Sequence, residues 1–163
     1  FKTNAFLRPQ AATNWDSSIT VLSPDGNTLF TFFGRDYLVE AVDLTAAAAV
    51  KKFRRIYPRI PHIENSWETD LRKKYGFPKI EYETDIRGLY PTNGHIWVET
   101  STEDRAKGRL VDVFDKGGRF VDSFYIGAGR MLMAVREGFV FCQEKNEDET
   151  ITIVKYKIDA NTH

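Results

Sequence analysis

Short apolar runs separated by turn residues recur along the chain. Three segments share the order of an apolar run, a turn and a second apolar run, at residues 19–33, 86–99 and 130–142. Their turns end at Gly26, Gly94 and Gly138. In the first two turns Asp or Asn precedes the glycine, which suits the positive φ angles of tight hairpin turns. The pattern therefore predicts three β-hairpins and a chain built mainly from antiparallel strands.

Further strand-like runs follow the hairpins and define a repeat. They lie at residues 37–43, 50–54, 109–115, 119–125 and 150–158. Gly94 and Gly138 are 44 residues apart, a length typical of one four-stranded unit, whereas Gly26 and Gly94 are 68 residues apart. This spacing predicts two four-stranded units and a nearly complete third, with an insertion between the first two.

The insertion contains the strongest helix signal in the sequence. Asn65 or Ser66 can cap the N-terminus of a helix, and Glu68 stands three residues after Asn65, as in a capping box. Gly76 followed by Pro78 ends the pattern. We therefore expect one α-helix near residues 65–75.

This helix has one apolar stripe, formed by Trp67, Leu71 and Tyr75 at four-residue spacing. The same spacing predicts an ion pair between Glu68 and Arg72 on the polar side. Two interpretations of the stripe stay open. It covers a surface of its own domain, or it docks a partner protein, since insertions on a rigid scaffold often carry recognition.

The sequence Val-Asp-Val-Phe-Asp-Lys-Gly-Gly-Arg-Phe-Val-Asp-Ser-Phe at residues 111–124 resembles NHL-like and related six-bladed β-propeller repeats. Residues 89–98 are similar to the preceding strand pair of such a repeat. The resemblance covers residues 17–55 and 85–158. It implies an all-β fold of propeller-type, four-stranded antiparallel blades. Because closed propellers have four to eight blades, about three blades predict an incomplete ring.

The resulting division is one propeller-like domain or fragment over residues 1–163. It comprises a blade at 17–55, a helical insertion at 56–84, a blade at 85–126 and a partial blade at 127–158. One position departs from the repeat, because the run Ala46–Ala49 stands where the first unit should carry a glycine-containing turn. Either this loop is a short helical turn, or the alanines do not record the true side chains.

Composition narrows the functional classes. The chain has 23 basic and 23 acidic residues, so no general attraction to nucleic acid or anionic lipid is expected. The single cysteine, Cys142, excludes a disulfide within the chain and a site with several thiolate ligands. No run approaches the roughly 20 apolar residues that span a bilayer. The chain starts at Phe1 without an initiator Met, and we expect a processed protein or a fragment.

Residues that carry chemistry are scattered. His62, His95 and His163 show no spacing of metal ligands. Carboxylates recur at the ends of strands and in turns, where they usually accept hydrogen bonds from the backbone; they are Asp43, Asp112, Asp115 and Asp122. We therefore assign no catalytic, cofactor-binding or metal-binding residue, and we expect no cofactor.

One charged run is distinctive. Residues 51–59 hold five basic side chains and two aromatic ones, with no acid. Such a run fits a solvated edge strand, and it also fits a surface that binds RNA or another anion through stacking and ion contacts. Arg54, Arg55 and Tyr57 are the candidate binding residues here, beside those of the helical stripe.

The favoured function is a non-enzymatic propeller scaffold or binding module, a subunit or fragment of a larger assembly. Its expected partners are other protein chains or the missing blades of the same protein. One alternative is a propeller enzyme of the lactonase or lyase type with a site in a central channel. Another is a nucleic-acid-binding module that uses residues 51–59. The family resemblance implies a periplasmic or extracellular location.

Overall fold

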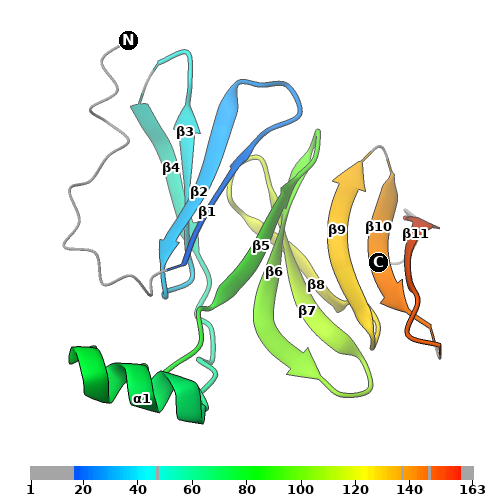
Figure 1. Ribbon diagram of the computed structural model, residues 1–163. Helices are drawn as coiled ribbons and strands as arrows, with labels where there is room; N and C mark the ends of the chain where they lie inside the picture. Colours follow the sequence, from blue (N-terminus) through cyan, green and yellow to red (C-terminus); the bar gives the residue numbers. More distant parts are fainter. Residues whose placement is uncertain (1–16, 47, 137, 147, 159–163) are drawn as a thin grey trace.

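The computed structural model describes residues 17–46, 48–136, 138–146 and 148–158, and it places in them three antiparallel sheets and one helix (Figure 1). Sheet 1 consists of β1 (Ser17–Leu22), β2 (Thr28–Gly34), β3 (Leu38–Asp43) and β4 (Ala48–Arg54). Sheet 2 consists of β5 (Ile86–Pro91), β6 (His95–Asp104), β7 (Gly108–Asp115) and β8 (Phe120–Tyr125). Sheet 3 consists of β9 (Arg130–Arg136), β10 (Phe139–Lys145) and β11 (Ile151–Lys157).

Within each sheet, strands that follow one another in the sequence are paired, so the strand order in each sheet follows the chain. The first strands of the sheets also lie close to one another, β1 beside β5 and β5 beside β9. The sheets therefore stand in a row like blades, with sheet 2 between the other two (Figure 1). The predicted all-β fold of propeller-type blades with one inserted helix is confirmed, and the described sheets form no closed ring.

Sheet 2 is buried on both faces because successive side chains of a strand point to opposite sides. In β6, Ile96 and Val98 face sheet 1 and join a core that includes Phe32 of β2. Trp97, between them, belongs to a second core shared with sheet 3, where it meets Leu132 of β9. Two separate apolar layers thus hold the three sheets together.

The turns follow the predicted chemistry in part. Gly26 and Gly138 have φ angles of 75° and 76°, as tight turns require. Gly94 does not have a positive φ, so that expectation was wrong. In its turn the hydroxyl of Thr92 accepts a hydrogen bond from the amide of His95 at 3.0 Å. A side chain therefore closes this turn in place of a special glycine conformation.

The turn between β3 and β4 needs no glycine, for a related reason. The Asp43 carboxylate accepts hydrogen bonds from the amides of Thr45 at 2.7 Å and Ala46 at 3.1 Å. Position 47 lies outside the described residues. Ala48 and Ala49 lie in β4, so a helical turn at these two positions was wrong.

Helix α1 (Ser66–Tyr75) confirms the predicted caps. The Asn65 side chain accepts a hydrogen bond from the Glu68 amide at 2.9 Å, and the Glu68 carboxylate accepts one from the Asn65 amide at 2.9 Å. Gly76 adopts the left-handed conformation, and its amide donates to the Arg72 carbonyl at 2.8 Å. The predicted ion pair of Glu68 with Arg72 is wrong, because Arg72 pairs instead with Glu64 at 2.7 Å.

Candidate functional site

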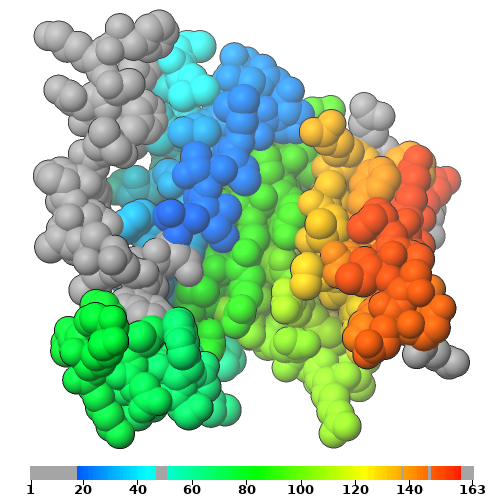
Figure 2. Space-filling model, viewed as in Figure 1, coloured from blue at the N-terminus to red at the C-terminus, as the bar shows by residue number. Residues whose placement is uncertain are grey.

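The apolar stripe of α1 is largely exposed. Trp67 and Tyr75 expose 62% and 56% of their surface, Leu71 is half-buried, and no residue of the helix is fully buried. Two isoleucines of the same insertion, Ile56 and Ile63, are 98% and 87% exposed. Figure 2 shows the insertion as a projection at one end of the molecule, beside sheet 1. Partner binding by Trp67, Leu71 and Tyr75 stays a prediction.

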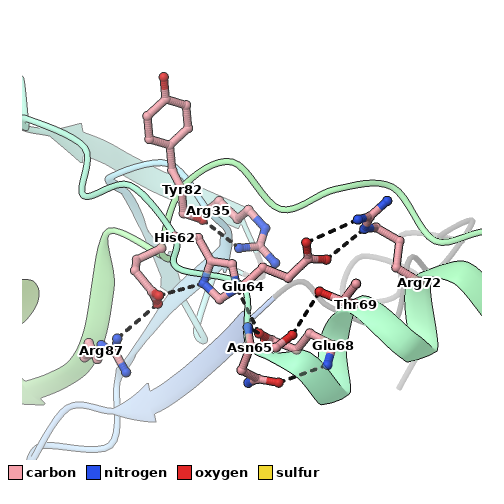
Figure 3. Close-up of polar contacts among 10 residues, drawn as sticks. Arg35, His62, Glu64, Asn65, Glu68, Thr69, Arg72, Tyr82 and Arg87 are labelled. Atoms are coloured by element: carbon pink, nitrogen blue, oxygen red, sulfur yellow. Dashed lines mark hydrogen bonds and ion pairs between the residues drawn. The ribbon is translucent and has the colours of Figure 1, made fainter.

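His62 connects the two ends of the insertion (Figure 3). One ring nitrogen lies 2.7 Å from a Glu83 oxygen, and the other lies 3.2 Å from a Glu68 oxygen at the start of α1. The hydrogen bond to Glu83 and the charge of both carboxylates raise the pKa of His62, so the ring holds a proton on each nitrogen more readily. His62 thus bridges Glu83 and Glu68, and the bridge is an ion pair when the ring is protonated.

The two ends of the insertion are joined to each other at its base and linked to sheet 1 by the side chain of Arg35. Pro61 and Tyr82 form an isolated β-bridge. Arg35, just after β2, donates a hydrogen bond to the Tyr82 carbonyl at 3.0 Å (Figure 3). The insertion is therefore anchored to the sheets at its base, while the apolar side chains described above stay exposed.

Two candidate residues of the basic stretch lie between sheets 1 and 2. Arg55 forms a hydrogen-bonded ion pair with Asp112, whose side chain is fully buried. The Tyr37 hydroxyl donates to the second oxygen of Asp112 at 2.9 Å, and burial raises the pKa of Tyr37. Tyr57 is buried, and its hydroxyl is hydrogen-bonded to Thr102. These contacts join parts of one chain, and partner binding by Arg55 and Tyr57 stays a prediction.

The remaining cations of residues 51–59 have intramolecular partners in most cases. Lys52 pairs with Glu40 at 2.7 Å. Arg59 lies 3.4 Å from an Asp36 oxygen and 3.6 Å from an Asp85 oxygen. Arg54 is exposed. A basic stretch in the sequence thus becomes a series of local ion pairs, which weakens its charge as a continuous surface.

The interface between sheets 2 and 3 contains a similar group of hydrogen-bonded polar side chains. The Tyr90 hydroxyl lies 3.0 Å from a Glu99 oxygen and 2.8 Å from the Leu132 carbonyl of β9. Arg109 donates to the other Glu99 oxygen at 3.0 Å. Both interfaces therefore combine a buried carboxylate with a tyrosine hydroxyl and an arginine, and neither carboxylate is a turn cap.

Of the carboxylates that were predicted to cap turns, Asp43 and Asp115 do so. The prediction that Asp112 caps a turn was wrong, because Asp112 lies buried within β7. Asp122 lies within β8 and accepts a hydrogen bond from the Ser123 amide at 2.7 Å.

Cys142 is buried, and burial raises the pKa of its thiol. Among the described residues, no group of three or more His, Cys, Asp or Glu side chains is placed to hold a metal ion.

Sheet 3 presents a second exposed apolar surface, which sequence reasoning missed. We call it the free face, and it lies on the side of sheet 3 away from sheet 2. Its four most exposed apolar members are Met131, Met133, Ile151 and Ile153, which expose 43%, 48%, 61% and 59% of their surface. Lys155 extends over the ring of Phe139 on this face, with its ammonium 3.7 Å from the ring centre. In the described part of the chain, β11 pairs with β10 alone, so its other edge is open.

No helix in the described ranges is long and apolar enough to cross a membrane.

No protein-family model matches the sequence, and no curated protein matches it. Among solved structures, one chain of the Kuenenia stuttgartiensis hydrazine synthase is similar, with a TM-score of 0.47 and 15% sequence identity. The match covers 85% of this chain and 38% of that chain. The present chain therefore corresponds to well under half the length of the protein it resembles.

Proposed function

We propose that this chain is a non-enzymatic β-sheet scaffold of the NHL-like, six-bladed propeller type, and that it works as part of a larger assembly. Its partner at the free face is a further antiparallel sheet of the same kind. That sheet comes from another protein chain or from further blades of the same protein. The observation that carries the proposal is the exposure of large apolar side chains on the free face.

The row of sheets itself supports this choice of partner. The corresponding face of sheet 2 holds Trp97, Val111 and Val113, and sheet 3 covers it. Sheet 3 offers methionines, isoleucines and phenylalanines on the side where a next sheet would stand. These four side chains are already about half buried, so covering what remains exposed contributes about 1 kcal/mol for each one. Exposed apolar patches of this kind are uncommon on monomeric proteins and mark interaction surfaces.

The open edge of β11 supports the proposal independently. Sheets 1 and 2 have four strands, and sheet 3 has three in the described residues. An edge strand with two exposed isoleucines is prone to pair with another strand unless something covers it. A fourth strand supplied by the partner would satisfy the outer backbone groups of β11, while the partner's stacked sheet would cover Ile151 and Ile153.

Charge substitution on the free face tests the proposal. Ile153→Glu should reduce both the self-association of the isolated chain, measured by light scattering over a range of concentrations, and its binding of an apolar dye. Leu44→Glu is the matched control, because Leu44 is 40% exposed in a turn of sheet 1. The proposal is contradicted if the unmodified chain stays monomeric and binds no dye, or if the two variants behave alike.

A further inference from the structure

A groove with charged and apolar side chains in its lining lies between sheets 1 and 2, at the end of the sheets opposite the insertion. Its volume is about 350 Å³, within the range of small-molecule sites. It is lined by the β1–β2 and β5–β6 turns, which lie next to each other in Figure 1, and by residues at the β3–β4 and β7–β8 turns. None of the candidate partner-binding residues lies in it, and neither does the free face, so this site is independent of the proposed scaffold function.

Two carboxylates of the groove each keep one oxygen unused. Asp25 accepts hydrogen bonds at Oδ1 from the Ser23 hydroxyl at 2.6 Å and the Asn27 amide at 3.1 Å. Asp43 accepts all its hydrogen bonds at Oδ1 as well, from Thr45 and Ala46. Within the described residues, Oδ2 of both side chains accepts none. These hydrogen bonds lower the pKa of both carboxyls, so each stays ionised near neutral pH.

Two lysines supply donors in the same groove. The Lys51 ammonium donates to the Lys116 carbonyl at 3.1 Å, which leaves two of its protons for other acceptors. Lys116 lies close enough to Asp25 for its charge to help keep that carboxyl ionised. Neither ammonium forms an ion pair with a described residue. The third carboxylate, Asp115, already pairs with Arg119 at 3.1 Å.

The floor between these charged groups is apolar. Ile96 is 1% exposed and packs in the core between the two sheets, and Phe30 of β2 lies half-buried against the same core. Both line the groove. The carboxylates and ammonium groups of the groove that form no ion pair in the part of the chain that the structure describes number two each, so their charges cancel, and the side chains of Asn93 and His95 add polar groups to the lining.

We propose that this groove binds a small neutral polyhydroxylated molecule of the saccharide class. A hydroxyl group both donates and accepts, so neighbouring hydroxyls can donate to the free oxygens of Asp25 and Asp43 and accept from Lys51 and Lys116. The C–H face of such a molecule would lie on the apolar floor. Because the opposite charges of the groove offset each other, an anion or a cation gains little net attraction there, whereas a neutral hydroxyl group can donate to one charged group and accept from the other.

Titration of the whole 163-residue chain with a panel of simple sugars tests the site. The panel holds glucose, galactose, cellobiose and maltose, with inorganic phosphate as the anionic probe and glucosamine as the cationic one. Saturation-transfer NMR and calorimetry report binding. At least one neutral sugar should saturate the protein, and phosphate and glucosamine should bind more weakly.

Asp43→Asn keeps the Oδ1 acceptor of the turn and removes the free carboxylate oxygen, so the dissociation constant should rise about tenfold or more. Asp104→Asn is the matched control, because Asp104 caps the β6–β7 turn in the same way, with amide distances of 2.9 Å, at the other end of sheet 2. It should change the constant by less than about twofold. Lys116→Gln, at an exposed turn position, should also weaken binding if Asp43→Asn disturbs folding. The site is refuted if no neutral sugar saturates, if phosphate or glucosamine binds more tightly, or if Asp43→Asn and Lys116→Gln leave affinity unchanged.

Discussion

Replacing Arg55 with Met tests how sheets 1 and 2 are held together. Arg55 neutralises the fully buried Asp112 across the interface, and its guanidinium also lies 5.1 Å from the ring centre of Phe120. The methionine would keep the apolar stem and leave Asp112 with only the Tyr37 hydroxyl as a partner. A carboxylate would then stay buried without a counter-charge.

The expected cost follows from that buried charge. Removing one partner of a buried ion pair destabilises proteins by about 3–5 kcal/mol. Arg55 is 34% exposed, so water partly screens the pair, and we expect a loss of about 2–3 kcal/mol in the free energy of unfolding. For a chain of this length the melting temperature should fall by about 4–12 °C.

Urea unfolding followed by tryptophan fluorescence measures the effect. Arg54→Met is the matched control, since Arg54 is the adjacent exposed arginine, and it should change stability by less than about 0.5 kcal/mol. Equal stability of the two variants would refute the reasoning, because the Arg55–Asp112 pair would then contribute nothing to the interface.

Two further predictions concern the insertion and a tight backbone contact. Because the folded pKa of His62 is raised, its stabilisation is fully present below about pH 6.5 and is lost as the pH rises through the folded pKa. In urea titrations, the free energy of unfolding of the wild type should therefore exceed that of His62→Gln by about 1 kcal/mol at low pH and by less at high pH. A difference that stays constant with pH would argue against a charged bridge. Gly108→Ala should cost about 2–4 kcal/mol, since φ is 84° and a Cβ would lie 2.1 Å from the Gly127 carbonyl oxygen. Gly94→Ala, which meets nothing within 4 Å, should be nearly neutral by thermal melting; similar losses in both would contradict this contact.

The fold was predictable where local chemistry decides it. The caps of α1 depend on residues within one helical turn, so Asn65, Glu68 and Gly76 could be read directly. The strand pairs depend on alternating apolar residues around turns, and these signals are also local. The glycine turn that failed, at Gly94, failed because the Thr92 hydroxyl closes the turn in another way.

The contacts between sheets were not predictable from the sequence. Arg55 and Asp112 are 57 positions apart, and nothing near either residue indicates the other. Asp112 stands in a strand whose neighbours resemble turn-capping positions, which led to the wrong expectation. His62 was missed as a bridge for the same reason, since Glu83 lies 21 positions away.

The free face of sheet 3 could be predicted from the sequence only in part. The run Met131-Leu-Met-Ala-Val135 is apolar on both sides of the strand, which is typical of a strand buried on both faces. The structure covers only the side that carries Leu132 and Val135. The sequence therefore carried the signal for a second covering layer, but only the arrangement of the sheets showed which side lacks one.

Oxidation of methionine tests the assembly proposal most directly. The two methionines of the chain, Met131 and Met133, both lie on the free face. Their rates of oxidation by dilute peroxide can be followed by peptide mass spectrometry in the native assembled protein and in the isolated 163-residue chain, diluted until it is monomeric. We predict much slower oxidation of both residues in the assembled protein, because a further sheet covers them. Equal rates in the two samples would contradict the account.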